Sequence, residues 1–222
     1  MPAKAPIPAR FTSLLLFLVL MGMNPLARAE FLLSSDNFNS WSNSCWRCDI
    51  DLHYDVIHGD VIRLNADRIF GATLENRVRR SAEYPELSWY WSLDPFIEPA
   101  IYFSMEVYFR ASVDRRKYMI RYTWNSEDPA GTVYALNERD NEWEWVVTGK
   151  EAEPLRWYEV KRHLSQDFAS LTGLHSSIDI YRIKVGLGSA EKRKLSASGY
   201  LSSVRIDPRP EPIWLDVVLP NE

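Results

Sequence analysis

The sequence predicts an all-β protein, an antiparallel β-sandwich with one short helix near residues 165–172. Apolar and polar residues alternate over several stretches of the chain, which is the period of a strand with one buried face. Turn residues separate these stretches at short intervals, as in sandwiches of antiparallel strands. Nine Trp and eleven Tyr among 222 residues support the same prediction, because both residue types favour strands.

The stretch 101–124 has the clearest strand pattern. Apolar and polar residues alternate without a break along its first half: Ile101, Phe103, Met105, Val107 and Phe109 alternate with Tyr102, Ser104, Glu106, Tyr108 and Arg110. A polar break at 112–117 precedes a second alternating run, 118–124, so the two runs should form an antiparallel hairpin. The odd-numbered side chains of the first strand should face the core, and the even-numbered ones should face outward.

Other strands are expected on the same grounds. In chain order they lie at 52–57, 61–64, 87–93, 132–136, 143–147, 157–163, 178–187 and 198–206, after a first edge strand within 31–41. The turn His58-Gly59-Asp60 joins the first two of the series, and 65–68 begins a polar connection. A change of phase at Ile180-Tyr181 predicts a bulge.

One segment, 165–171, is expected to be helical. Ser165 can cap its N-terminus, Asp167 lies in its first turn, and Gly173 follows its last residue. These are start and stop signals of a helix, so about two turns are expected.

Residues 1–29 have the pattern of a signal peptide. Lys4 and Arg10 precede an apolar run, and Ala27-Arg28-Ala29 supplies small residues at the two positions that a signal peptidase recognises. The apolar run is shorter than the ~20 residues that span a bilayer, so no transmembrane anchor is expected after cleavage. The protein is therefore expected to be exported, to the periplasm of a bacterium or beyond it.

The remaining 193 residues are enough for one domain, which we place at 30–206. A Pro-rich arm at 207–222 follows, with a short strand at Ile213 to Leu219 that could pair with a sheet edge or dock on a partner. Removal of residues 1–29 takes away three basic residues and no acidic one, which changes the formal net charge from −4 to −7. That charge excludes nucleic-acid binding by bulk electrostatic attraction.

The two cysteines, Cys45 and Cys48, are expected to form a disulfide in an exported protein. A redox-active thiol pair is an alternative, but the residues after Cys48 indicate a strand rather than the helix that lowers a thiol pKa. A zinc site with His53 and His58 is a further alternative. Covalent haem attachment requires a His directly after the second Cys, where this chain has Asp49. No cofactor is expected.

Several segments resemble a known fold family. The C-terminal segments that carry the resemblance are Arg156-Trp157-Tyr158, 162–168, 180–186 and 199–206. They resemble the closing strands of galactose-binding-like jelly rolls, a fold of many carbohydrate-binding modules, and 85–91 looks like a motif of exported bacterial proteins of unknown function. The resemblance implies a jelly-roll type of sandwich and a binding or scaffolding role. Many such modules carry an Asp near a structural calcium where this chain has Leu201-Ser202, so no metal site is expected.

The candidate site is the polar face of the strand 101–110. Tyr102, Glu106, Tyr108 and Arg110 lie on that face, and Arg121 on the partner strand is expected to join them. Aromatic rings can stack on sugars, and the charged groups can bond their hydroxyls. The alternative is a solvated sheet face with one cross-strand ion pair.

These patterns favour an exported, non-catalytic module that recognises a glycan or a similar polar polymer. An envelope structural protein whose partner contact is Ile213 to Leu219 is an alternative. A polysaccharide lyase or hydrolase is another, for which Glu106, Asp128, Glu144, His163 and His175 are available. A hydrolase needs a converging carboxylate pair, and no spacing in the sequence selects one.

Overall fold

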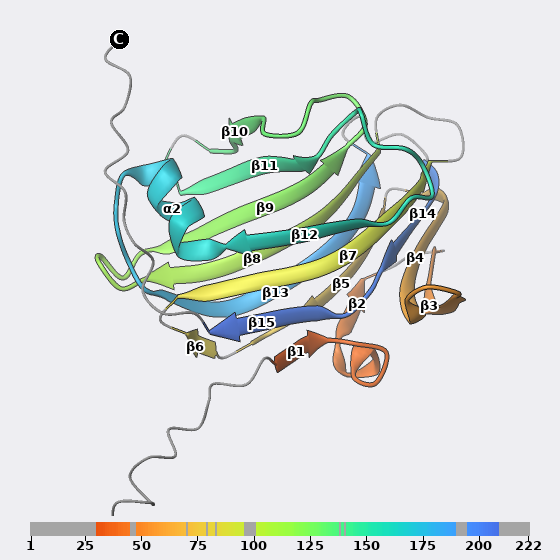
Figure 1. The fold of residues 1–222 in the computed structure, drawn as a ribbon, viewed down its shortest axis with the longest axis horizontal. Helices are drawn as coiled ribbons and strands as arrows, with labels where there is room; N and C mark the ends of the chain where they lie inside the picture. Colours follow the sequence, from red (N-terminus) through yellow and green to blue (C-terminus); the bar gives the residue numbers. More distant parts are fainter. Residues whose placement is uncertain are drawn as a thin grey trace, which may run out of the picture.

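The computed structural model describes residues 30–44, 48–69, 71–78, 80–82, 84–95, 101–137, 139, 141–189 and 195–208. These residues form two β-sheets that pack face to face, with a short helix at one end (Figure 1). The sheets are called sheet A and sheet B below. The expected fold class is confirmed: the described residues form a β-sandwich of jelly-roll type, and their α-helix lies in the expected place.

Sheet A contains the strand that the sequence predicted at 87–93, which is the central part of β7 (Pro85–Pro95). Its path is β1 (Glu30–Leu33), β15 (Val204–Pro208), β7 (Pro85–Pro95), β14 (Leu195–Leu201), β4 (Gly59–Ile69) and β3 (Cys48–Asp55), and β12 (Tyr158–His163) also pairs with β7. All of these pairings are antiparallel. β14 and β15 pair with successive parts of β7, and Ser202-Ser203 separates them.

Sheet B contains the predicted hairpin. Its path is β10 (Val133–Ala135), β11 (Glu142–Thr148), β9 (Lys117–Asn125), β8 (Ile101–Ala111), β13 (Ile178–Ser189), β5 (Gly71–Asn76) and β2 (Ser42–Ser44), and β6 (Arg80–Ala82) also pairs with β13. β8 and β9 pair in antiparallel register, as expected. β9 and β11 pair in parallel, so sheet B is mixed.

The core lies between the sheets. Phe103, Met105, Val107 and Phe109 of β8 are all buried in it, which confirms the inward face predicted for this strand. Large rings from β7 meet them: Trp91 lies 5.5 Å from Phe103 between ring centroids. Interleaved rings of this size fill the space at the density of a protein interior.

The helix α2 (Leu164–Thr172) follows β12 directly and lies at one end of the sandwich (Figure 1). It ends at Gly173, whose φ of 72° is the left-handed conformation expected of a helix C-cap, and the Gly173 N–H donates to the Ala169 carbonyl. The prediction that Ser165 is the N-cap is wrong. His163 holds that position without a side-chain capping hydrogen bond, and Ser165 is the buried second residue of the helix.

The helix places a carboxylate inside the sandwich. Asp167 accepts hydrogen bonds from the Tyr122 hydroxyl at 2.6 Å and from Arg162 Nε at 2.8 Å. The Arg162 guanidinium lies 4.2 Å from the centroid of the Trp145 ring. We call Tyr122, Arg162 and Asp167 the inner triad, and it connects α2 and β12 of one layer to β9 of the other.

Two expected boundaries change, and one expected irregularity is confirmed. The polar connection expected at 65–68 is instead the second half of β4, which continues to Ile69. The single closing strand expected at 198–206 is two strands, β14 and β15. The bulge expected at Ile180-Tyr181 is confirmed by the register shift between Ile180 and Arg182.

Two expected segments lie outside the described residues. The expected signal peptide, 1–29, is one, and the greater part of the Pro-rich arm, with Ile213 to Leu219, is the other. Within the part of the chain that the structure describes, no helix has the length and apolar character needed to span a membrane.

Candidate functional site

The outer face of sheet B carries most of the predicted site residues. Strand pairing sets Glu106 of β8 beside Arg121 of β9 on one side and Lys184 of β13 on the other. Side chains of paired residues lie on the same face of a sheet, about 4.5–5.5 Å apart at Cβ. The pleat therefore projects all three outward while their neighbours in sequence enter the core.

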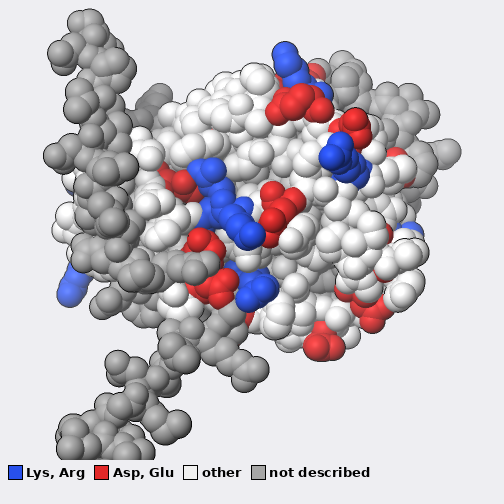
Figure 2. All heavy atoms as spheres, viewed as in Figure 1, with Lys and Arg blue, Asp and Glu red and all other residues white. Residues whose placement is uncertain are grey.

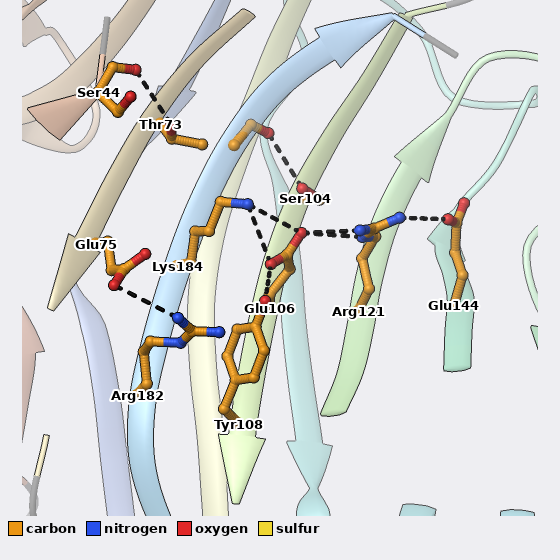
Figure 3. Close-up of polar contacts among 11 residues, drawn as sticks. Ser44, Thr73, Glu75, Ser104, Glu106, Tyr108, Arg121, Glu144, Arg182 and Lys184 are labelled. Atoms are coloured by element: carbon orange, nitrogen blue, oxygen red, sulfur yellow. Dashed lines mark hydrogen bonds and ion pairs between the residues drawn. The ribbon is translucent and has the colours of Figure 1, made fainter. Parts of the chain in front are cut away.

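Glu106 is the centre of this face. Its Oε1 lies 3.0 Å from Arg121 Nη2, its Oε2 lies 3.3 Å from Lys184 Nζ, and the Tyr108 hydroxyl donates to Oε2 at 2.6 Å (Figure 3). Only 4% of Glu106 is exposed, although it does not belong to the hydrophobic core. Its carboxylate is thus covered and held by the long side chains that bind it.

The contacts of Glu106 change its acidity. Burial alone would raise the pKa of this carboxyl, but the hydrogen bond from Tyr108 and the positive charges of Arg121 and Lys184 outweigh burial, and the pKa is lowered from 4.5. Burial, together with the hydrogen bond to Glu106, raises the pKa of the Tyr108 hydroxyl. At neutral pH Glu106 is therefore an ionised acceptor and Tyr108 is a neutral donor.

The contacts continue to both sides of Glu106 (Figure 3). Arg121 Nη1 also reaches Glu144 Oε2 at 3.3 Å on β11. On β13, Arg182 Nη1 lies 3.6 Å from Glu75 Oε1, and its guanidinium lies 3.6 Å from the Tyr108 ring centroid. We call the connected set the outer network: Glu75, Glu106, Tyr108, Arg121, Glu144, Arg182 and Lys184.

The outer network crosses five neighbouring strands of sheet B, from β5 to β11. It contains three cationic side chains and three carboxylates, which balance one another. Charge-assisted hydrogen bonds such as those that Glu106 accepts from Tyr108 and Arg121 orient both partners. The face therefore offers fixed donors and fixed acceptors side by side without a net charge of its own.

Tyr102 lies beside the outer network on β8. A Cβ atom added to Gly188 of the neighbouring strand would come within 2.6–3.1 Å of the Tyr102 ring and hydroxyl, so the ring lies against bare backbone. Burial raises the pKa of Tyr102, and the nearby charge of Arg121 opposes that shift. The ring is thus a partly buried, neutral surface near Arg121.

Arg110 is at the far end of the face. It is exposed, its guanidinium lies 5.7 Å from the Tyr181 ring centroid, and it pairs in register with Lys117 and Asp179. Of the five predicted site residues, Glu106, Tyr108 and Arg121 are joined by direct contacts, Tyr102 lies beside them, and Arg110 lies apart.

Sequence reasoning missed four residues of the outer network. They are Glu75, Glu144, Arg182 and Lys184. Arg182 and Lys184 were visible as polar positions of the strand 178–187, and Glu144 as a polar position of 143–147. Their link to Glu106 depends on which strands are neighbours and in what register, and alternation within one strand does not contain that information.

The other candidate residues do not join this face. Cys48 begins β3, but Cys45 lies outside the described residues, so the disulfide stays a prediction. Among the described residues, no group of three or more His, Cys, Asp or Glu side chains could hold a metal ion. His163 precedes α2, and His175 is exposed in the connection after it.

No protein-family model matches the chain, and no curated protein matches it in sequence. Solved structures do share its fold. A family 61 carbohydrate-binding module in complex with β-1,4-galactotriose is 10% identical with a TM-score of 0.41, over 78% of this chain and 90% of that one. The C-terminal family 22 module of Clostridium thermocellum Xyn10B is 7% identical with a TM-score of 0.43, over 83% of this chain and 96% of that one.

One of the similar structures is an enzyme domain. The catalytic domain of Humicola grisea Cel12A is 12% identical with a TM-score of 0.44, over 80% of this chain and 90% of that one. At these identities and TM-scores, the similarity assigns no ligand and no activity to this chain. The solved structures to which the chain is similar include several carbohydrate-binding modules.

Proposed function

We propose that this protein binds a glycan on the outer face of sheet B, without converting it, and that it does so as an exported protein. The observation that carries the proposal is the environment of Glu106: an ionised carboxylate held by two cations and a hydroxyl in the middle of a sheet face. The proposed ligand contacts are Tyr102, Glu106, Tyr108 and Arg121, extended to Glu144 and Lys184, with Arg110 at the end of the same face.

Sugar hydroxyls need both donors and acceptors at fixed positions. The outer network supplies carboxylate oxygens as acceptors and the N–H groups of Arg121 and Lys184 as donors. Because these groups already hold one another in place, little side-chain entropy would be lost when a ligand binds. Such pre-organisation favours recognition of a polymer that meets the face at several points.

An apolar surface beside the network would complete such a site. The Tyr102 ring lies against the backbone at Gly188 and stays partly exposed. One face of the Tyr108 ring is covered by the Arg182 guanidinium, which fixes the ring in one orientation. A pyranose ring could stack on Tyr102 while its hydroxyls reach the outer network.

The acidity of Glu106 favours binding over hydrolysis. A glycosidase needs a carboxyl whose pKa is raised so that it can protonate the leaving oxygen. The pKa of Glu106 is lowered instead. Glu106 therefore suits the role of a permanent hydrogen-bond acceptor better than that of a general acid.

Affinity gel electrophoresis against a panel of soluble polysaccharides, after a glycan array, tests the proposal. We expect the wild-type protein to be retarded by at least one neutral glycan, and we expect Tyr102→Ala and Arg121→Met to weaken that retardation at least tenfold. Arg116→Met is the matched control, because Arg116 is an exposed residue of the β8–β9 turn. A wild-type protein that binds no glycan of the panel would contradict the proposal.

A further inference from the structure

A hollow of about 710 Å³ lies on the outer face of sheet A, on the side of the sandwich away from the outer network. Its floor is made by outward residues of β7, β12 and β15, and its rim by the turn after β1 and the β3–β4 turn. The volume is within the usual range of small-ligand sites, ~300–1,000 Å³. In Figure 2, basic and acidic residues gather together near the middle of this face.

One wall of the hollow is aromatic. The rings of two lining residues, His58 and Tyr90, lie 5.0 Å apart between centroids. The His58 ring also lies 4.4 Å from the ring of Trp157, which is not itself a lining residue. Asp55 fixes this group, because it accepts the Trp157 Nε1–H at 3.1 Å and the His58 backbone N–H at 2.8 Å. The rings are therefore held in place before any ligand arrives.

Two hydrogen bonds to Ser202 also fix the backbone of Tyr90. Its backbone N–H donates to the Ser202 hydroxyl at 3.1 Å, and its carbonyl accepts the Ser202 N–H at 2.9 Å. A hydrogen bond to Glu159 is the main cause of the raised pKa of the Tyr90 hydroxyl. The aromatic wall thus has a carboxylate at its edge.

The lining has more carboxylates than cations. Its five acidic residues are Asp36, Asp60, Glu86, Glu159 and Asp207, and its two basic ones are Lys161 and Arg205. Each of the two cations lies within reach of an acid of its own strand: Lys161 Nζ is 2.6 Å from Glu159, and Arg205 Nη2 is 3.7 Å from Asp207. Among the described lining residues, carboxylates therefore outnumber cations by three.

Hydroxyl groups complete the lining. Five serines contribute to it, from the turn after β1, from β7 and from the break between β14 and β15: Ser34, Ser35, Ser88, Ser202 and Ser203. Serine hydroxyls both donate and accept hydrogen bonds. The hollow therefore combines fixed rings, hydroxyls and a negative charge excess, whereas the outer network is balanced in charge.

We propose that this hollow is a second binding site, and that it binds a sugar residue that carries a protonated amino group. The rings of Tyr90 and His58 offer a surface for the face of a pyranose, and the serines offer partners for its hydroxyls. The lining carboxylates, Glu86 and Asp60 among them, attract the ammonium group. The Tyr90 ring also stabilises that group by a cation–π contact. An uncharged sugar would gain only part of this interaction.

Isothermal titration of the full chain with three hexasaccharides tests this second site. They are β-1,4-linked glucosamine, its N-acetylated counterpart and cellohexaose, at low ionic strength and at a pH where the amine is protonated. We expect the glucosamine hexamer to bind at least tenfold more tightly than the other two. Glu86→Gln and Tyr90→Ala should each remove at least nine tenths of that preference.

Controls separate this site from the glycan site on sheet B and from simple charge attraction. Tyr54→Ala, an exposed residue of the neighbouring strand β3, should leave the preference unchanged. Arg121→Met should leave it unchanged too, although it is expected to weaken binding on sheet B.

Three results would overturn the second site. They are equal affinity for the amino and the N-acetylated hexamer, unchanged binding by Glu86→Gln, and equal affinity for spermidine, a polyamine without a sugar ring. Because Glu86→Gln keeps the shape of the side chain, the test does not depend on whether Tyr90→Ala folds.

Discussion

The inner triad and the outer network contain the same three kinds of side chain, a carboxylate bound by a tyrosine hydroxyl and an arginine. In the inner triad, Asp167 accepts from Tyr122 at 2.6 Å and from Arg162 at 2.8 Å. In the outer network, Glu106 accepts from Tyr108 at 2.6 Å and from Arg121 at 3.0 Å. The local chemistry is nearly identical, so any difference in role must come from the surroundings.

The surroundings differ at the tyrosine and the cations, because the two carboxylates are similarly buried, with 7% of Asp167 and 4% of Glu106 exposed. Tyr122 is completely buried, and the Arg162 guanidinium lies 4.2 Å from the centroid of the Trp145 ring. Tyr108 is only partly buried, and Glu106 has a second cation beside it, Lys184 of the neighbouring strand β13. The inner triad therefore stabilises the packing of the two layers, whereas the outer network keeps polar groups where a ligand could replace some of their contacts.

The largest expected effect belongs to the inner triad. Asp167→Ala leaves the Arg162 cation and the Tyr122 hydroxyl without their partner between the sheets, and breaking a buried pair in this way costs about 3–5 kcal/mol. Urea unfolding followed by fluorescence measures the change. Asp179→Ala, an exposed control on β13, should stay within about 0.5 kcal/mol of the wild type. A loss below about 1 kcal/mol for Asp167→Ala would show that the inner triad does not stabilise the packing.

A smaller loss is expected at the centre of the outer network. Glu106→Gln removes the negative charge between Arg121 and Lys184, but Arg121 keeps Glu144 and both cations keep access to water. We expect the free energy of unfolding to fall by about 1–3 kcal/mol. We expect glycan retardation to be affected more strongly than stability. Glu142→Gln is the matched control on the same face of β11. Equal retardation of both variants would remove Glu106 from the proposed site.

The two tyrosines allow the most direct comparison. Tyr122→Phe removes the completely buried hydroxyl that donates to Asp167, and about 1–2 kcal/mol should be lost. Tyr108→Phe removes the corresponding hydroxyl at the outer face, where water can replace it, and less than about 1 kcal/mol should be lost. Thermal unfolding of the two variants side by side measures the difference. Equal losses would mean that the two surroundings do not differ as described.

The smallest effect is expected from pH. The pKa of Glu106 is lowered from 4.5 in the folded protein, so the folded state takes up this proton less readily than the unfolded one. The stability that Glu106 contributes is therefore fully present above about pH 4.5 and is lost as the pH falls through the folded pKa. Unfolding measured between about pH 6 and pH 3 should show a shallower loss for Glu106→Gln than for the wild type. Parallel curves would contradict this.

The sequence predicted those features that depend on one strand at a time. Alternation placed Phe103 and Phe109 in the core and Glu106 outside it, and Gly173 marked the end of the helix. The prediction of Ser165 as the N-cap was wrong because β12 leads directly into the helix, and His163 holds the N-cap position without a side-chain capping hydrogen bond. The positions of Lys184 and Glu144 could not be predicted, because strand neighbours and register are set by the whole sandwich.

Strand order has a consequence for how the chain folds. β14 lies between β7 and β4 in sheet A, and β13 lies between β8 and β5 in sheet B. In each sheet, a segment from the last quarter of the described chain thus separates strands that come much earlier. Neither layer can close until residues 178–201 are present, so assembly depends on distant encounters and should be slow. A chain shortened before residue 178 would expose unpaired edges on both layers and would be prone to aggregate.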